Sequence, residues 1–316
     1  MPSEFEIIRR YFTRAVSHTV LGVGDDAALI KVAPGMQLAV STDMLVSGRH
    51  FFPNAAPYQL GRKALAVNLS DMAAMGATPR WALLAGALPR ADAKWLRRFT
   101  RGFMDLAKKF KVDLIGGDTT RGPLNLCVQI LGEVPKGKAL RRAGAKTGDD
   151  IWVSGTLGDA ALALAHLQKR IQLAPHELKI CLPALHMPQP RVALGKSLLG
   201  IAHAAIDISD GLLADLGHIL ERSRVGATLE YGLLPRSRAM KNHAAQAMQA
   251  LLAGGDDYEL CFTVPPRRRS DVAKLAKKIN LPLTRIGKIT RGKGLLLLDA
   301  AGKRMKINSR GFDHFG

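Results

Sequence analysis

The sequence has few cysteines and few aromatic residues. Its three cysteines, Cys127, Cys181 and Cys261, stand far apart and form no CxxC pair, so they provide neither a zinc ligand set nor a disulfide framework. We therefore expect reduced thiols and a cytoplasmic protein. Aromatic residues make up only 5% of the chain, which leaves few platforms on which nucleic-acid bases could stack.

Long apolar runs and the common nucleotide-binding motifs are absent as well. No apolar run approaches the ~18 residues that cross a bilayer, and the first residues lack the apolar segment of a secretory signal. We expect no membrane association. Nothing in the chain matches a P-loop or a Rossmann fingerprint in its strand–turn–helix context. Neither a Ser/His/Asp arrangement nor a reactive cysteine is evident, so we expect no protein nucleophile.

The chain is strongly basic. Its 316 residues carry a formal net charge of +20, which is compatible with RNA binding or with a solvated basic surface that attracts a polyanionic small substrate. RNA binding predicts an affinity that falls steeply with salt, but no nucleic-acid module is visible. We therefore favour the basic surface and expect no nucleic-acid partner.

Glutamate is scarce beside aspartate, with 7 glutamates against 19 aspartates. Glutamate is the better helix former, so the surplus aspartates belong to loops and helix starts. Several follow glycines or apolar strand-like runs: Asp25 and Asp26, Asp43, Asp118, Asp207 and Asp210, Asp256 and Asp257. We expect strand ends to bring such carboxylates together. Mg²⁺ binds through one or two carboxylates plus substrate phosphates, so these residues predict Mg²⁺-dependent phosphate chemistry.

Strand-like and helix-like segments alternate along the chain without strict regularity. Apolar periodicity predicts helices over 58–75 and 92–110 and, after an acidic turn at 207–211, over 212–220. Strands are expected over 36–40, 124–134, 151–155 and 201–206. Another strand is expected to begin at Val112 and run into a glycine-rich acidic loop, and a further one to follow the glycine-acid loop that begins at Ala253 and to reach Val264. We predict an α/β or α+β fold in two domains, residues 1–147 and 148–316.

Seven motifs resemble, in the same order, those of the thiamine-monophosphate kinase family in the aminoimidazole-ribonucleotide-synthetase-like superfamily. They are Gly22-Val-Gly-Asp-Asp26, Ser41-Thr-Asp43, Asn68-Leu-Ser-Asp71, Gly116-Gly-Asp-Thr-Thr120, Asp207-Ile-Ser-Asp-Gly211, Asp257-Tyr-Glu-Leu260 and Gly311-Phe-Asp-His-Phe315. The resemblance spans nearly the whole chain. It implies an N-terminal domain whose sheet forms a homodimer, a C-terminal α/β domain, and direct transfer of the ATP γ-phosphoryl group to thiamine monophosphate.

The resemblance also implies roles for individual residues. Several Mg²⁺ ions would be held by Asp26, Ser41, Thr42, Asp43, Asp71, Asp118, Asp207 and Asp210. ATP would contact Gly117, Asp118, Arg142 and Ser209. The thiamine substrate would contact His50, Asp256 and Phe312. One position departs from the family, because its Gly-Gly-Glu-Asp-Tyr-Glu-Leu pattern has Asp256 here in place of glutamate.

Other members of the superfamily remain alternatives. A cysteine before the GDD motif would favour selenophosphate synthesis, and a C-terminal cysteine tail would favour the hydrogenase-maturation carbamoyl dehydratase; the sequence has neither. Aminoimidazole ribonucleotide synthetase, the phosphoribosylformylglycinamidine cyclo-ligase, is harder to exclude from the residues. A catalytically silent scaffold would tolerate loss of Asp71 or Asp118, yet both are present.

Overall fold

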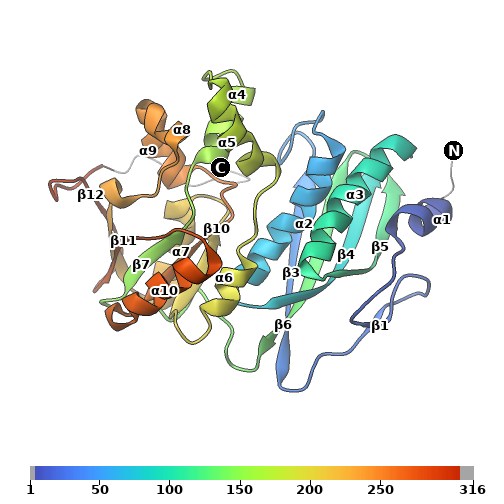
Figure 1. The fold of residues 1–316 in the computed structure, drawn as a ribbon, viewed down its shortest axis with the longest axis horizontal. Coiled ribbons are helices and arrows are strands. Elements are labelled where there is room, and N and C mark those ends of the chain that lie inside the picture. Colours follow the sequence, from blue (N-terminus) through green and yellow to red (C-terminus); the bar gives the residue numbers. More distant parts are fainter. Residues whose placement is uncertain (1–3, 307–316) are drawn as a thin grey trace. The chain divides into compact units, whose positions relative to one another are not determined.

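The structure, a computed structural model, describes residues 4–306 and the side chains from Glu6 onward. The chain divides into two compact units. The first comprises the chain up to Met72 together with Ala77–Gly137, and the second comprises Ala73–Gly76 together with the chain from Lys138 onward. Both units combine helices with a β-sheet (Figure 1), so the predicted α/β fold in two parts is confirmed.

The first unit is built on a four-stranded sheet in the order β3-β6-β4-β5. The strands are β3 (Met36–Val46), β4 (Thr78–Leu88), β5 (Asp113–Arg121) and β6 (Asn125–Pro135). Only β4 and β5 pair in parallel. The N-terminal segment contains α1 (Glu4–Ile7), a π-helical turn (Ile8–Phe12), β1 (Thr19–Leu21) and β2 (Leu29–Ile30).

Helices α2 (Pro57–Ala74) and α3 (Ala93–Phe110) lie side by side across one face of this sheet (Figure 1). The carboxylate of Asp92 caps α3 by accepting hydrogen bonds from the backbone N–H groups of Lys94 and Trp95 at 2.9 and 3.1 Å, which satisfies donors that have no partner within the helix. Two glycines permit the close packing of the helices. A Cβ atom on Gly61 or on Gly102 would lie 2.0 Å from a backbone oxygen of the other helix.

Among the described residues of the first unit, no helix covers the opposite face of the sheet (Figure 1). Side chains alternate between the two faces of a strand, so every second residue of β3 points away from α2. Leu38, Val40 and Met44 are consequently 39%, 61% and 52% exposed. This leaves an apolar sheet surface in contact with solvent.

The second unit is built on a six-stranded sheet in the order β12-β9-β11-β7-β10-β8. The strands are β7 (Asp150–Ser154), β8 (Ala204–Ile208), β9 (Gly226–Glu230), β10 (Glu259–Val264), β11 (Leu283–Thr290) and β12 (Gly294–Leu298). The helices are α4 (Asp159–Leu167), α5 (Pro175–His186), α6 (Val192–Ser197), α7 (Leu212–Ser223), α8 (Arg238–Asn242), α9 (Ala244–Ala253) and α10 (Arg269–Ile279), with 3₁₀ turns at Tyr231–Leu233 and Pro266–Arg268.

One core of the second unit joins α4, α5, α7, α8 and α9 to alternate residues of the sheet. Ile151 and Val153 of β7 and Ile206 and Ile208 of β8 all belong to it. Asp150 immediately precedes Ile151, so its side chain faces the other way, and it pairs with Arg269 of α10. Helix α10 therefore lies against the opposite face, where it contacts α6 (Figure 1).

A transmembrane helix is not found in the part of the chain that the structure describes, since no helix there is both long and apolar enough to cross a bilayer.

Candidate functional site

In the first unit, Ser41 and Asp71 are brought together by β3 and α2. The hydroxyl of Ser41 donates a hydrogen bond of 2.5 Å to Oδ2 of Asp71. Asp43 lies on the same face of β3, two residues further on. Thr42 lies on the other face by alternation and is exposed, so it could join these groups only through its backbone carbonyl. The sequence predicted a strand ending before Ser41, but β3 continues to Val46, and these residues lie within it.

Helix α2 also carries a buried side-chain oxygen close in sequence to Asp71. The amide nitrogen of Asn68 donates to the carbonyl oxygen of Ala64 at 3.1 Å, and the side chain is fully buried. Its Oδ1 atom has no hydrogen-bond partner in the structure. Most buried polar atoms are paired, so an unpaired buried oxygen is available to bind a ligand. Oδ1 of Asn68 is therefore a second candidate oxygen ligand for a metal ion on the helix that carries Asp71.

Gly117 and Asp118 lie on β5, which the sequence predicted to end in an acidic loop but which extends to Arg121. Gly117 has a φ angle of +149°, and a Cβ atom there would lie 1.9 Å from the carbonyl oxygen of Leu84, so only glycine fits. Strands β6 and β4 separate β5 from β3. At about 4.8 Å per strand, Asp43 and Asp118 of one chain are too far apart to share an ion.

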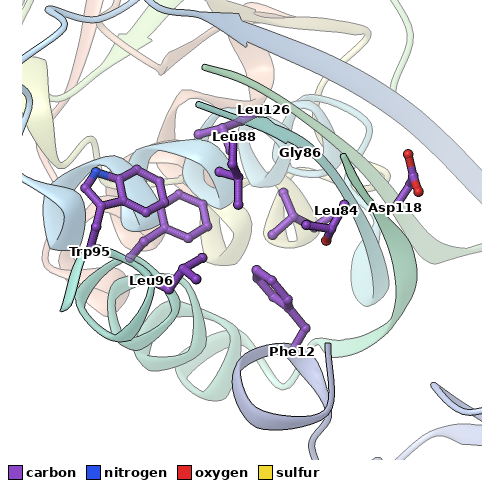
Figure 2. A pocket seen from close by; sticks show the side chains of 10 residues that line it. Phe12, Leu84, Gly86, Leu88, Trp95, Leu96, Asp118 and Leu126 are labelled. Atoms are coloured by element: carbon purple, nitrogen blue, oxygen red, sulfur yellow. The ribbon is translucent and has the colours of Figure 1, made fainter. Parts of the chain in front are cut away.

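A small hollow lies beside Asp118. Figure 2 shows that its walls are mainly apolar and that the carboxylate of Asp118 points away from Phe12. Phosphate groups bind where positive charge or converging N–H donors compensate them, and among the described residues no cationic side chain lines this hollow. We therefore assign the exposed carboxylate of Asp118, and not the hollow, to the candidate site.

His50 and Asp26 lie elsewhere in the first unit. The Nδ1 atom of His50 accepts a hydrogen bond of 2.9 Å from the backbone N–H of Val46, so the ring proton of neutral His50 is on Nε2. The ring is thereby fixed against the end of β3. Asp26 is exposed in the turn between β1 and β2.

In the second unit, Asp207, Ser209 and Asp210 lie where β8 leads into α7. Asp215, in the first turns of α7, folds back over this connection, and its Oδ2 atom accepts hydrogen bonds from the backbone N–H groups of Ser209, Asp210 and Gly211 at 3.0, 3.1 and 3.1 Å. Burial and the charges of Asp207 and Asp210 raise the pKa of Asp215 to about 7. The connection is thus a closely packed group of carboxylates.

The turn that precedes β10 lies beside this connection. The backbone N–H of Asp256 donates to the carbonyl oxygen of Ser209, and that of Tyr258 donates to the carbonyl oxygen of Ile208, both at 2.8 Å. The hydroxyl of Tyr258 donates to Oδ1 of Asp256 at 2.9 Å. Residues predicted to bind nucleotide, metal and thiamine substrate therefore lie on two hydrogen-bonded turns of one unit.

Asp257 anchors the turn before β10 to the start of α4. Its two carboxylate oxygens accept hydrogen bonds from the backbone N–H of Gly158, at the start of α4, at 2.9 and 3.1 Å. Burial raises the pKa of Asp257 well above its usual range, although the Gly158 bond acts in the opposite direction.

Arg142 lies in the loop before β7, near the beginning of β8. The adjacent carbonyl oxygen of Arg141 accepts from the backbone N–H of Ala205 at 3.1 Å, and the hydroxyl of Ser223 donates to the carbonyl oxygen of Arg142 at 3.1 Å. Ser209 follows Ala205 by four residues, or roughly 13 Å of strand. Arg142 and Ser209 could therefore contact different parts of one extended ligand. The predicted substrate contact Phe312 lies outside the described residues.

The donor atoms of these residues suit Mg²⁺. They are carboxylate and hydroxyl oxygens, together with the buried unpaired Oδ1 of Asn68, and hard oxygen ligands are what Mg²⁺ prefers. Within residues 4–306 there is no group of three His, Cys, Asp or Glu side chains that could hold a metal unaided. The chain therefore fits ions that are bound by one or two carboxylates and complete their coordination with substrate phosphates.

No role in the site was predicted from the sequence for three residues of the second unit. They are Asp215, Tyr258 and Asp257, whose hydrogen bonds hold the two turns in place. Asp215 falls five residues after Asp210 on a helix and reads as an ordinary first-turn acid. Two residues of the turn have left-handed backbone conformations, Asp256 with φ +66° and Tyr258 with φ +49°. No sequence pattern predicts this conformation. Only the hydrogen bonds distinguish them.

Comparison with known proteins identifies the family. Residues 24–134 match the AIR synthase related protein N-terminal domain, and residues 146–298 match the corresponding C-terminal domain. The thiamine-monophosphate kinase of Escherichia coli K12 is 46% identical over 99% of this chain and 98% of its own length. That of Bacillus subtilis is 34% identical over 99% of both.

Solved structures agree. The crystal structure of thiamine-monophosphate kinase from Stenotrophomonas maltophilia K279a is 47% identical, covers 95% of both chains and has a TM-score of 0.86. A structure of AaThiL complexed with AMPPCP and TMP is 32% identical, covers 93% of this chain and 92% of its own, and has a TM-score of 0.79. The fold expected from the sequence motifs is confirmed, and the chain belongs to the thiamine-monophosphate kinase family of AIR synthase related proteins.

Proposed function

We propose that the chain transfers the γ-phosphoryl group of ATP directly to the phosphate of thiamine monophosphate, giving thiamine diphosphate and ADP. One observation of this structure carries the proposal: the turn with Ser209 and Asp210 is hydrogen-bonded to the turn with Asp256. The related AaThiL structure contains AMPPCP and TMP together, which supports ATP as the co-substrate.

Direct transfer requires positioning rather than a nucleophile. Burial raises the pKa of the Cys181 thiol to about 12 and that of Cys261 higher still, so neither supplies a thiolate near neutral pH. This supports the expectation that no covalent enzyme intermediate forms. What the chain must provide is alignment of two anionic groups that repel each other.

Mg²⁺ ions would supply the positive charge that lets these anions approach. We propose that they are held by the predicted ligands Asp26, Ser41, Thr42, Asp43, Asp71, Asp118, Asp207 and Asp210. The separation of Asp43 from Asp118 across the sheet supports more than one ion. We propose that Arg142, Ser209 and Gly117 orient ATP, because a guanidinium fork and an unobstructed backbone suit phosphate oxygens.

The thiamine end of the acceptor would contact His50, Asp256 and Phe312. The carboxylate of Asp256 suits a cationic ring, and the position of Asp256 is fixed by Tyr258. The Nε2–H of His50 would act as a hydrogen-bond donor, because Nδ1 is occupied by Val46.

We also propose a homodimer that forms through the open sheet face of the first unit, in a cytoplasmic setting. The exposed Leu38, Val40 and Met44 support the dimer, since an apolar patch of this kind marks an interaction surface. The three unpatterned cysteines support a reducing compartment.

The test is to incubate the protein with Mg-ATP and thiamine monophosphate and to record ³¹P NMR spectra. We expect diphosphate doublets of thiamine diphosphate together with ADP. An Asp118→Asn variant should be folded, as judged by circular dichroism, and inactive. ADP accompanied by free inorganic phosphate, with no new diphosphate, would overturn the transfer and favour a cyclising synthetase.

A further inference from the structure

The side chain of Asp215 has a role that the proposed ligand set leaves out. It is 3% exposed, and one of its oxygens receives three successive backbone N–H groups, those of residues 209–211. Successive N–H groups that converge in this way form a cavity for an anion. Here the anion is part of the chain itself.

Helix capping does not account for this arrangement. A capping box satisfies the N-cap N–H with the side chain at the third helical position, whereas Asp215 is the fourth residue of α7 and also binds the two residues before the N-cap, Gly211. Those two residues are Ser209 and Asp210, which carry the proposed nucleotide and metal contacts. Asp215 therefore fixes the backbone that presents them.

The peptide unit between Ser209 and Asp210 connects this anchor to the neighbouring turn. Its N–H donates to Asp215 at 3.1 Å, and its carbonyl oxygen accepts from the N–H of Asp256 at 2.8 Å. The peptide is thus held at both ends. Asp256 has a φ of +66°, a conformation that persists only where surrounding contacts impose it.

We propose that Asp215 is a positioning residue for both substrates: through the Ser209–Asp210 peptide it sets the distance between the nucleotide turn and the Asp256 turn. The inference rests on the proposed function, since it assumes that these turns bind ATP and thiamine monophosphate. It requires the hydrogen-bond acceptor of Asp215 and does not require its charge.

Binding measurements test the requirement. Asp215→Asn retains an oxygen for the three N–H groups, so it should bind Mg-AMPPCP and thiamine monophosphate, each measured alone by calorimetry, with affinities near those of the unmodified chain. Asp215→Ala should weaken both ligands by about tenfold or more, the order expected when buried N–H groups lose their partner. In turnover, KM for both substrates should rise in Asp215→Ala and be restored in Asp215→Asn.

The matched control is Asp92→Ala, which removes a carboxylate that accepts two backbone N–H groups at the start of α3 in the first unit. It should lower stability and leave both affinities unchanged. Should Asp215→Ala fail to fold, Asp215→Glu replaces it, because the extra methylene carries the carboxylate past the three N–H groups. Unimpaired binding by that variant would overturn the proposal, as would equal losses in Asp215→Asn and Asp215→Ala.

Hydrogen exchange separates this inference from the proposed function, because it needs no substrate. In Asp215→Ala the amides of residues 209–211 and also that of Asp256 should exchange faster, while Asp92→Ala should leave them protected. Faster exchange confined to 209–211 would refute the coupling between the turns. If Asp215→Ala speeds exchange at residues 209–211 and at Asp256 as expected, but the unmodified chain does not bind thiamine monophosphate, the kinase proposal is refuted and the coupling between the turns stands.

Discussion

Replacing Arg191 by methionine should strongly destabilise the second unit. The guanidinium of Arg191, just before α6, binds both carboxylate oxygens of Glu259 at the start of β10; the Nε to Oε2 distance is 2.7 Å. Ser154 donates to the same Oε2 at 2.5 Å and accepts from the backbone N–H of Leu260 at 2.9 Å. The side chains of Arg191 and Glu259 are 24% and 6% exposed.

The magnitude follows from the burial. Methionine keeps much of the volume of arginine but leaves the Glu259 carboxylate with one hydroxyl donor. Removing one partner of a buried ion pair costs about 3–5 kcal/mol. For a unit of this size each kcal/mol lowers Tm by about 2–4 °C, so the expected loss is roughly 6–20 °C.

Thermal unfolding followed by circular dichroism without ligand measures this loss. Arg268→Met is the matched control, because Arg268 pairs with Asp271 at 2.8 Å while both side chains are at least one-third exposed, and such a pair contributes about 0–1 kcal/mol. The double variant Arg191→Met/Glu259→Gln should lose less than the sum of the single losses. A drop for Arg191→Met no larger than that of Arg268→Met, or additive losses, would refute the buried-pair reasoning.

Three further predictions concern thiols, acid stability and assembly. Burial raises the thiol pKa values of Cys181 and Cys261, so a thiol-reactive dye should label neither of them in the native chain and both after unfolding; labelling of either in the folded protein would contradict this burial. A hydrogen bond from the backbone N–H of Ala174, and smaller contributions from Asn242 and His243, lower the pKa of Glu177 from 4.5 to about 2. The ionised Glu177 carboxylate therefore stabilises the fold fully above pH 4.5, and this contribution is lost as the pH falls towards 2. The Tm deficit of Glu177→Gln should shrink over that interval, and a constant deficit would contradict the lowered pKa. Val40→Asp on the open sheet face should convert a dimer to a monomer in light scattering with its fold retained, whereas an unchanged mass would remove this face from the interface.

Strongly periodic segments of the fold were predictable from the sequence. The apolar stripe that includes Trp95, Phe99 and Phe103 predicted a helix over 92–110, and α3 spans Ala93–Phe110. Strand β4 (Thr78–Leu88) was missed. It pairs with β6 on one side and β5 on the other, and most of its residues are at least half-buried, so it lacks the alternation that identifies a strand with one solvated face.

Strand ends explain the least accurate part of the site prediction. Asp43 and Asp118 were expected to follow their strands, yet both lie within them. Strand β3 pairs with β6 without interruption from Met36 to Val46, and this pairing extends the strand through polar residues that a sequence pattern assigns to a loop. The expectation that strand ends bring the carboxylates together is therefore wrong for Asp43 and Asp118 of one chain, because β6 and β4 lie between their strands. The connection predicted at residues 207–211 was placed to within two residues, because β8 ends at Ile208 and α7 begins at Leu212.

The one departure from the family motif has a physical explanation in the turn that contains it. Asp256 adopts a φ of +66°, and aspartate is several-fold enriched among non-glycine residues in this left-handed region. Its short side chain also reaches the Tyr258 hydroxyl at 2.9 Å, two residues further along a turn that is itself held to Ile208 and Ser209. A glutamate would carry the carboxylate one methylene beyond that hydroxyl. The shorter side chain therefore has less reach, but its carboxylate is held in a fixed position by the Tyr258 hydroxyl and by the turn.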